Sequence, residues 1–586
     1  MPEEKEILEL GRHSLAHVLA KAVCELFGDV RLAIGPAIDN GFYYDFDLPH
    51  TIAEVDYAAI EAKMTEILRR REPFTRKELS KAEALVLFAG NPYKTELIEA
   101  LPEGEILSVY WTGEDFADLC RGPHVENAQA LLSWAFKIAS VAGAYWRGDE
   151  HNPMLQRVYV NAFPNKQGLK EYLAFLEEAQ KRDHRRLGPQ LDLFFLDETA
   201  PGMPYLLPNG VKLYNTLLAL WREVHYARGY QEILAPQLNH YSLWKTSGHW
   251  DHYQENMFLV ELSEEQIYGL KPMSCPNAIL TYLRKTRSYR DLPLRIAEIG
   301  HVHRREPSGT LHGLFRVQGF HQDDSHNFVT EEQIPDEIND ILDIADLLYD
   351  VFGLKVSPTL STRPDDFMGE IALWDQAEQQ LKQVLDARYG AGSYKVDEGG
   401  GAFYGPKIDI KVTDALGRVW QTATIQLDFQ LARNFEMTYA DRDGQLKIPV
   451  VVHRAVFGSL ERFIGIIIEH FAGKFPFWLS PLQVGVVPVR EEEHAAYADE
   501  IAAKLQQAGL RVKVDHSNGT MGNKVKTFRQ ELAPYIVIVG DQERDGGTIS
   551  LRIRTGQQVN GIAPEAFIAA CGKMTKDCAL ELAEEF

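Results

Sequence analysis

One cysteine and two histidines, far apart in the chain, are the residues best suited to hold a metal ion. Cys275 lies in KPMSCP, His326 ends the QDDSH run, and His453 lies in VVVHRAVFGS. One sulfur and two imidazoles would give zinc three protein ligands and leave the fourth tetrahedral position open to a substrate. Each residue alone is more often an ordinary buried side chain, because long separations carry no spacing signal. Together they predict a site for recognition or catalysis.

A predicted β-hairpin in the middle of the chain carries an unusual amount of charge. Residues 296–302 and 314–320 are rich in β-branched and aromatic side chains, and the segment between them has a turn-forming composition. Arg304 follows the first predicted strand and Arg316 lies on the second. Arginine offers permanently charged, planar donors to phosphate oxygens, so the hairpin predicts a triphosphate site. The alternative is a solvated hairpin with surface ion pairs.

Length and composition limit the class of protein. At 586 residues the chain is too long for one core and should form roughly three or four domains. The formal net charge of -23 argues against nonspecific nucleic-acid binding, so any RNA contact must use local basic stretches. The five cysteines form no regular framework and are expected to be reduced. No apolar run could span a membrane and the acidic N-terminus lacks a signal-peptide core, which predicts a cytoplasmic protein.

Residues 1–160 are predicted to form a separate α/β domain with a second cluster of reactive side chains. His13 and His17 share a helix face, and Cys120 and His124 follow an aromatic strand. These residue types leave a zinc site and a metal-free hydrolytic pocket equally open. A third reading is two core histidines and a buried cysteine.

The remaining chain divides where its pattern changes. The linker predicted over residues 161–187 is an amphipathic helix that Gly188 and Pro189 end. Residues 188–475 show a pattern typical of a mostly antiparallel sheet, and residues 481–586 follow a βαβ-like order that predicts a small α/β domain. No Walker-type or GxGxxG phosphate loop is present, so arginines would have to hold ATP.

Three segments resemble the signature motifs of one enzyme class. The hairpin resembles motif 2 of the class II aminoacyl-tRNA synthetases, residues 453–465 resemble their motif 3, and residues 221–238 their motif 1. KPMSCP, the QDDSH run and the motif 3 histidine are similar to the threonyl-tRNA synthetases in particular. The resemblance covers essentially the whole chain. It implies an α+β fold, in which a class II catalytic core on an antiparallel sheet lies between an N-terminal editing domain and a C-terminal anticodon-binding domain.

The same resemblance implies a threonine-tRNA ligase that uses ATP, L-threonine and tRNA(Thr), with Mg²⁺ accompanying ATP and a zinc ion in each subunit. It also implies a homodimer formed through motif 1. Most bacterial members carry a small extra domain before the editing domain, but here the HSLAH motif begins at residue 13, so that extension is expected to be missing.

The resemblance assigns roles to single residues. Arg304 would contact the α-phosphate of ATP and Arg462 the γ-phosphate. The other catalytic candidates are Lys407, His249 and Gln426. Positions matching the family's adenine, threonine and adenylate pocket are Met273, Glu306, Arg316, Phe320, Gln322, Asp324, Tyr404, Gln421 and Ser459. The zinc ligands would be Cys275, His326 and His453.

The terminal domains carry matching positions as well. The resemblance implies that the N-terminal domain hydrolyses mischarged seryl-tRNA(Thr) without zinc. Its candidate editing residues are His13, His17, Lys94, Asp118, Cys120 and His124. The candidate anticodon-reading residues are Asn518, Glu543 and Arg552.

Amino-acid discrimination predicts two separate pockets. A site built around a hydroxyl rejects valine by roughly 10⁴ or more, whereas serine, shorter by one methyl, is disfavoured by only about 1 to 3 kcal/mol. A second, hydrolytic pocket is therefore expected.

The alternatives to a threonine-tRNA ligase are another zinc-dependent class II ligase and a catalytically silent RNA-binding paralogue. The complete set of motif arginines and candidate metal ligands argues against a silent paralogue, which would have no chemical reason to keep them.

Overall fold

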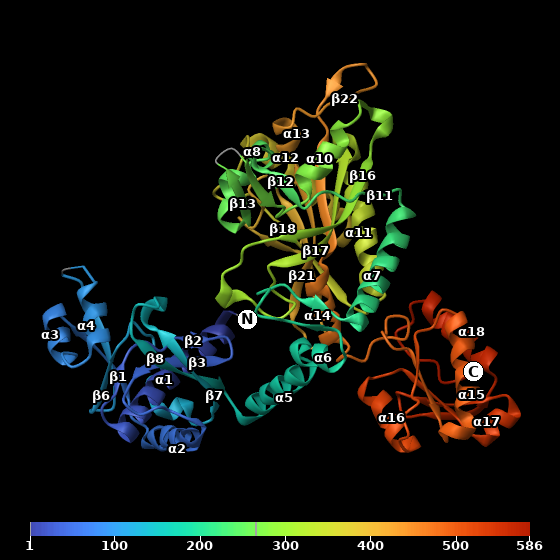
Figure 1. The fold of residues 1–586 in the computed structure, drawn as a ribbon. Coiled ribbons are helices and arrows are strands. Elements are labelled where there is room, and N and C mark those ends of the chain that lie inside the picture. Colours follow the sequence, from blue (N-terminus) through green and yellow to red (C-terminus); the bar gives the residue numbers. More distant parts are fainter. Residues whose placement is uncertain (1, 103, 264–265) are drawn as a thin grey trace. The chain divides into compact units, whose positions relative to one another are not determined.

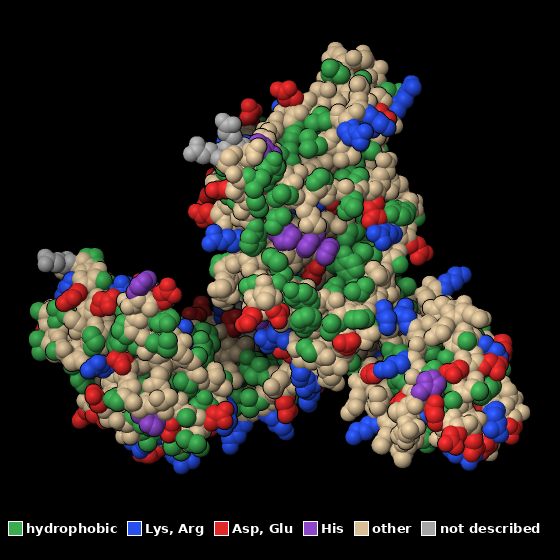
Figure 2. All heavy atoms as spheres, in the orientation of Figure 1, with side chains coloured by type: hydrophobic (Ala, Val, Ile, Leu, Met, Phe, Trp, Pro, Cys, Tyr) green, Lys and Arg blue, Asp and Glu red, His purple; other side chains and the backbone are tan. Residues whose placement is uncertain are grey.

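A computed structural model describes residues 2–102, 104–263 and 266–586 (Figure 1). The chain separates into two compact units, Met1–Glu178 and Ala179–Phe586. Throughout these described ranges, each helix is too short or too polar to cross a membrane. Figure 2 shows acidic and basic side chains intermixed over the drawn face.

The N-terminal unit is built from two antiparallel sheets. The larger has the order β1-β3-β8-β7, with β2 paired to β3. Its strands are β1 (Arg31–Leu32), β2 (Ala37–Ile38), β3 (Gly41–Asp47), β7 (Ala135–Tyr145) and β8 (Met154–Phe163). The smaller sheet joins β4 (Phe74–Leu79), β5 (Leu107–Thr112) and β6 (Phe116–Leu119). The helices of this unit include α1 (Pro2–Phe27), α2 (Glu54–Arg70), α3 (Lys81–Leu87) and α4 (Pro92–Glu99). Apolar residues of α1 and α2 pack on the larger sheet to form the main core of the unit.

An eight-stranded sheet is the centre of the second unit, in the order β11-β16-β17-β24-β21-β20-β18-β19. Its strands are β11 (Gln231–Glu232), β16 (Leu294–His303), β17 (Gly319–Val329), β18 (Lys355–Ser361), β19 (Lys395–Asp397), β20 (Lys407–Thr413), β21 (Val419–Asp428) and β24 (Val450–Ser459). Only the pairs β11–β16 and β18–β19 are parallel within this sheet, so the predicted, mostly antiparallel sheet is confirmed. The largest apolar core lies between it and the helices α7 (Pro208–Tyr226), α11 (Ile334–Asp350), α12 (Ile371–Tyr389) and α14 (Leu460–His470).

The second strand of the charged hairpin differs from its prediction. β16 contains the predicted first strand, residues 296–302, but β17 begins only at Gly319 and continues through the QDDSH run. Leu314, Phe315 and Arg316, predicted to lie in the strand, belong to the connecting loop, and Leu314 and Phe315 are buried. Their strand-like composition reflects burial of the loop rather than sheet pairing, because β propensity measures packing as much as backbone preference.

The predicted linker helix is interrupted earlier than expected. It consists of α5 (Lys166–Arg182) and α6 (His184–Gln190), and the side chain of Asp183 between them caps α6. Gly188 and Pro189 lie inside α6 instead of ending a helix. A Cβ atom at Gly188 would meet the ring of Phe194 at 2.2 Å, so this glycine permits close packing.

The C-terminal part of the second unit has a five-stranded sheet in the order β26-β25-β27-β28-β29. Its strands are β25 (Val484–Pro488), β26 (Val512–Val514), β27 (Tyr535–Val539), β28 (Ile549–Ile553) and β29 (Gln558–Ile562). The first three are parallel, as the βαβ pattern predicted, and the last two are added antiparallel. The accompanying helices are α15 (Glu491–Gln507), α16 (Met521–Gln530), α17 (Asp541–Gly546) and α18 (Pro564–Lys576).

Candidate active sites

Cys275, His326 and His453 come from three elements of the core and meet at one point. Cys275 is the first residue of α10 (Cys275–Leu283), and His326 on β17 lies opposite His453 on β24. Their candidate ligand atoms lie within 4.8 Å of one another, and all three residues are buried. Nε2 of His326 is buried and has no hydrogen-bond partner among the described residues, a costly state that a metal ion would relieve.

Asp428 supports this cluster from behind. Its Oδ2 lies 3.0 Å from Nε2 of His453, and its side chain is fully buried. Burial opposes protonation of His453, but the neighbouring Cys275 and Asp428 outweigh it and raise the pKa of the imidazole to about 10. Cys275 and Asp428 therefore favour a positive charge beside them. A carboxylate behind a histidine is a common support for a zinc ligand. The donor set fits zinc.

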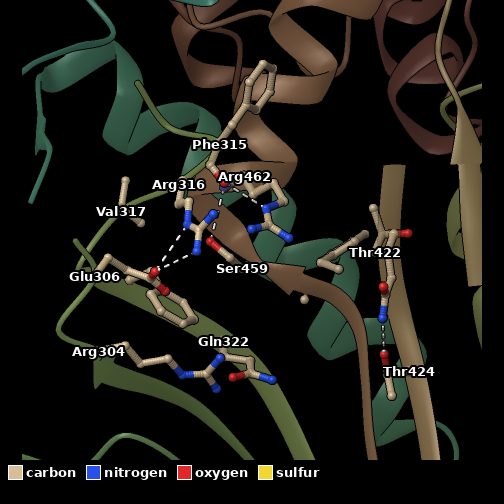
Figure 3. A pocket seen from close by; sticks show the side chains of 14 residues that line it. Arg304, Glu306, Phe315, Arg316, Val317, Gln322, Thr422, Thr424, Ser459 and Arg462 are labelled. Atoms are coloured by element: carbon tan, nitrogen blue, oxygen red, sulfur yellow. Dashed lines mark hydrogen bonds and ion pairs between the residues drawn. The ribbon is translucent and has the colours of Figure 1, made fainter. Parts of the chain in front are cut away.

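A polar pocket lies between the charged hairpin and the turn from β24 into α14 (Figure 3). Eight predicted residues line it: Arg304, Glu306, Arg316, Phe320, Gln322, Gln421, Ser459 and Arg462. Figure 3 shows Arg304 on one side of the space and Arg316 and Arg462 on the other. Three guanidinium groups around one small space make it suited to a polyanion such as a triphosphate.

Hydrogen bonds fix the lining of this pocket. Arg316 donates to Oε2 of Glu306 from Nε at 3.1 Å and from Nη2 at 2.9 Å. Arg462 donates from Nε to the carbonyl of Phe315 at 2.8 Å. The hydroxyl of Ser459 caps α14 by accepting from the backbone N–H of Arg462 at 3.1 Å. The cap and the carbonyl together orient Arg462.

A second pocket adjoins the first, since Arg304, Gln322 and Thr424 line both. Eight predicted residues lie on its wall: Met273, Cys275, Arg304, Gln322, Asp324, Tyr404, Gln426 and His453. Tyr404 donates its hydroxyl hydrogen to Oε1 of Gln426 at 2.8 Å. Burial raises the pKa of Asp324 to about 7. The metal cluster thus borders a pocket that is open to the arginine-lined space.

His249 and Lys407 are outside the lining of both pockets and lie behind their walls. Nδ1 of His249 lies 2.8 Å from Oγ of Ser247, and burial lowers the pKa of His249 to about 4. Nζ of Lys407 lies 2.9 Å from Oδ2 of Asp409, whose other oxygen accepts from Nε2 of Gln421 at 2.7 Å. Lys407 is therefore connected to the pocket wall through Asp409 and Gln421.

The reactive side chains of the N-terminal unit also converge. Ligand atoms of His13, His17, Cys120 and His124 lie within 4.8 Å of one another. Sγ of Cys120 lies 3.2 Å from Nε2 of His13 and 3.2 Å from Nε2 of His124. Burial lowers the pKa of His13 and raises the pKa of Cys120 to about 11. Burial lowers the pKa of His17 and His124 as well, so the surroundings favour neutral imidazoles and a protonated thiol.

A buried carboxylate joins the remaining predicted residues to this cluster. Asp118 lies 2.5 Å from Nζ of Lys94 through Oδ1 and 3.6 Å from Nε2 of His17 through Oδ2. Tyr44 donates its hydroxyl hydrogen to Oδ2 of Asp118 at 2.5 Å. Tyr44 was not predicted, because an aromatic residue in a strand gives no sign that its hydroxyl faces a carboxylate. Asp428 and Asp409 were not predicted either, because neither lies in a recognisable motif.

The three candidate anticodon residues are on separate elements of the C-terminal sheet region. Glu543 on α17 accepts from the backbone N–H of Gly540 at 2.9 Å and from Oγ of Ser550 at 2.6 Å. Arg552 lies on β28, and its Nε is buried with no hydrogen-bond partner within the described part of the chain. Asn518 lies in a bend before α16.

Three family matches agree with this architecture. Residues 258–471 match the tRNA synthetase class II core domain (G, H, P, S and T), and residues 483–574 match an anticodon binding domain. Residues 107–159 match the threonyl and alanyl tRNA synthetase second additional domain. The fold and the sites define a class II aminoacyl-tRNA synthetase with an editing-type domain.

Curated relatives narrow the assignment. A threonine-tRNA ligase of Thermotoga maritima is 50% identical over 587 residues, covering 100% of this chain and 90% of the relative. A threonine-tRNA ligase of Clostridioides difficile is 48% identical over 573 residues, covering 97% of this chain and 89% of the relative. The chain therefore belongs to the threonyl-tRNA synthetases, ATP-dependent ligases that charge tRNA with threonine.

Solved structures show the same kinship. The RNA-binding domain of the threonyl-tRNA synthetase of Cryptosporidium parvum Iowa II has a TM-score of 0.64 at 40% identity, covering 67% of this chain and 98% of its own. A putative threonyl-tRNA synthetase of Aeropyrum pernix has a TM-score of 0.60 at 28% identity, covering 68% of this chain and 98% of its own.

Proposed function

We propose that the two joined pockets of the core bind ATP and L-threonine and form threonyl-adenylate. The observation that carries this proposal is that Arg304, Gln322 and Thr424 line both pockets. Arg304 then stands where the threonine carboxylate meets the α-phosphate. A fixed guanidinium at this place offsets the negative charge that develops as the carboxylate attacks.

Threonine would be selected in the second pocket. Cys275, His326 and His453 would hold a zinc ion, which would supply a Lewis acid able to accept the amino group and the hydroxyl of threonine. Asp324, on the wall of this pocket, would accept a hydrogen bond from the hydroxyl. Valine offers no hydroxyl and would leave a buried polar group unpaired, so it is rejected at this step.

ATP would be held by the hairpin and by α14. Arg316 and Glu306 form an ion pair with each other. Bound ATP would replace this pair, and Arg316 would then contact a phosphate and Glu306 the adenine. Phe320 would stack on the adenine ring, and Arg462 would bind the γ-phosphate, with Mg²⁺ accompanying the nucleotide. Gln426 and His249 would then serve the transfer to the terminal ribose of tRNA(Thr).

The cluster in the N-terminal unit would hydrolyse the ester of seryl-tRNA(Thr). A neutral His13 can accept a proton from the attacking water, and the ammonium of Lys94 can offset the developing oxyanion. Cys120 is a poor nucleophile because its raised pKa keeps the thiol protonated. Since the residue types also suit zinc, metal analysis distinguishes the two modes: we expect about one zinc ion per chain, and about two would show a metal in this pocket as well.

The partners proposed from the family are tRNA(Thr) and a second copy of the chain. Asn518, Glu543 and Arg552 would read anticodon bases. Two leucines of the motif 1 segment support a dimer, since Leu234 is 91% exposed and Leu238 is 43% exposed. Light scattering should give about twice the 66.4 kDa mass of the chain, and a mass near 66.4 kDa would contradict the dimer. The tRNA and ATP that such an enzyme uses support a cytoplasmic location.

The role of Arg304 is tested by replacing it with glutamine. Threonine-dependent ATP-pyrophosphate exchange should fall by about 100-fold or more, the usual cost of removing a charge-stabilising donor. Arg305→Ala is the matched control, because its exposed side chain is adjacent but does not line either pocket. Equal activity of R304Q and R305A would contradict the proposal.

A further inference from the structure

The ring of His184 lies between the linker and the loop of the charged hairpin. His184 is the first residue of α6 and is 0% exposed. Its Nδ1 lies 2.6 Å from Oε1 of Glu469, and its Nε2 accepts from the backbone N–H of Leu314 at 2.9 Å. A single neutral tautomer, protonated on Nδ1, satisfies both partners. The ring therefore has a defined orientation.

Two loop residues connect this ring to the motif 3 arginine. Leu314 binds His184, and the carbonyl of the next residue, Phe315, accepts from Nε of Arg462 at 2.8 Å. Phe315 also lines the arginine-rich pocket. Helix α14 carries both Arg462, near its start, and Glu469, near its end. The contacts thus connect Glu469 with Arg462, both on α14, through His184 and the loop residues.

The loop that carries Leu314 and Phe315 also packs closely on His184. Gly313 has a φ of +50°, and a Cβ atom there would lie 2.1 Å from Nε2 of His184. The ring centroid of Phe315 lies 4.2 Å from that of His184 and 4.3 Å from that of Trp420. The loop can approach the histidine this closely only because residue 313 is a glycine.

Further contacts hold Glu469 and the end of α14 in place. Oε2 of Glu469 lies 2.5 Å from Nη2 of Arg418, which in turn lies 2.6 Å from Asp414. Burial works against ionisation of Glu469, but its hydrogen bonds to His184 and the nearby Arg418 lower its pKa, so it is a carboxylate. Arg182, the last residue of α5, donates to the carbonyl of His470 at 2.9 Å. Figure 1 shows α6 beside α14, where these contacts lie.

We propose that His184 is a positioning residue for ATP. By holding the backbone of Leu314 and Phe315, it sets the place of Arg462 and Arg316 at the phosphate end of the pocket. It also makes the linker part of the ATP site, so that the segment between the editing unit and the core contributes to activation. This inference rests on the proposed function of the arginine-lined pocket as the ATP site.

Two conservative substitutions separate the two hydrogen bonds of the ring. In His184→Asn the amide can still donate to Glu469 but falls short of Leu314, whereas in His184→Gln the side-chain oxygen can take the place of Nε2. In threonine-dependent ATP-pyrophosphate exchange, H184N should raise the KM for ATP by about tenfold, the cost of one buried hydrogen bond, and leave the KM for threonine within about twofold. H184Q should stay within about threefold of the unaltered chain for both substrates.

Gly313→Ala provides an independent test if H184N fails to fold. Its methyl group would push the loop away from His184, so it too should raise the KM for ATP while leaving hydrolysis of seryl-tRNA(Thr) unchanged. An unchanged KM for ATP in H184N and G313A, or equal rises in the KM values for ATP and threonine, would overturn the positioning role. Absence of exchange in the unaltered chain would refute the proposed function itself, which separates the two failures.

Discussion

Cys275, at the start of α10, would contribute a soft sulfur ligand to the proposed zinc site, with the imidazoles of His326 and His453 as the other two ligands. A serine hydroxyl at this position would bind zinc far more weakly than a thiolate does. Cys275→Ser should therefore reduce the zinc content of the purified chain to less than about a tenth of the original. Cys578→Ser is the matched control, because Cys578 is a free cysteine outside every candidate metal group of the described residues. Full zinc content in C275S, measured by metal analysis, would contradict the ligand assignment.

His13 offers a test by pH in the editing pocket. Burial is the main cause that lowers its pKa from the ordinary value of 6.5. A general base works when neutral, so hydrolysis should be at its plateau above this pKa and fall as pH decreases through it. Single-turnover hydrolysis of seryl-tRNA(Thr) should thus be level from about pH 7 to 8 and lose activity only below pH 6.5. A decline that begins above pH 7 would argue against His13 as the base.

The turn from β24 into α14 is the element that delivers Ser459 and Arg462 to the pocket. Gly458 in this turn has a φ of +69°, and a Cβ atom would lie 2.6 Å from the carbonyl oxygen of Thr422. Gly458→Ala should lower the free energy of unfolding by about 2 to 4 kcal/mol, because left-handed strain and a backbone clash add. It should also raise the KM for ATP.

Gly444→Ala is the control for this element. Gly444 has a φ of +81° but no atom within 4 Å of a built Cβ, so only the left-handed strain applies and about 1 to 2 kcal/mol should be lost. Urea unfolding monitored by circular dichroism measures both variants. Equal losses in the two would show that the contact with Thr422 contributes nothing.

The hairpin shows how far the sequence could predict these elements. Its first strand was predicted because β-branched and aromatic residues are frequent there, and its arginines were predicted to bind phosphate because they are planar, permanently charged donors. Its second strand was misplaced, since Leu314 and Phe315 are apolar for a different reason: they are buried in the loop near His184 and Trp420. Tertiary burial of a loop leaves the same composition as a strand, so only the folded chain distinguishes them.

The site was predictable where the chemistry is carried by rare residue types in recognisable motifs. The supporting carboxylates were not, because Asp409 and Asp428 follow no motif and become neighbours of their partners only through strand pairing. His184 was hidden in the same way. It was assigned only to an amphipathic linker helix, whereas its side chain is completely buried.

At the scale of the whole molecule, the two compact units predict separable activities. A shortened chain that begins at Lys166, the start of α5, keeps the catalytic sheet and the anticodon-type domain. It should retain threonine-dependent exchange within about threefold and lose hydrolysis of seryl-tRNA(Thr), because the cluster around Cys120 is gone. Misacylation of tRNA(Thr) with serine would then accumulate. A shortened chain that still hydrolyses the ester would place editing elsewhere.

Amino-acid-dependent ATP-pyrophosphate exchange on the zinc-replete, 586-residue chain tests whether the core selects threonine through a metal-centred site. Threonine, serine and valine are compared, with Cys275→Ser as the second protein. We expect strong exchange with threonine, weaker exchange with serine, none with valine, and loss of all exchange in C275S. Exchange with valine comparable to that with threonine, or full activity in C275S, would contradict selection by a metal-centred hydroxyl site.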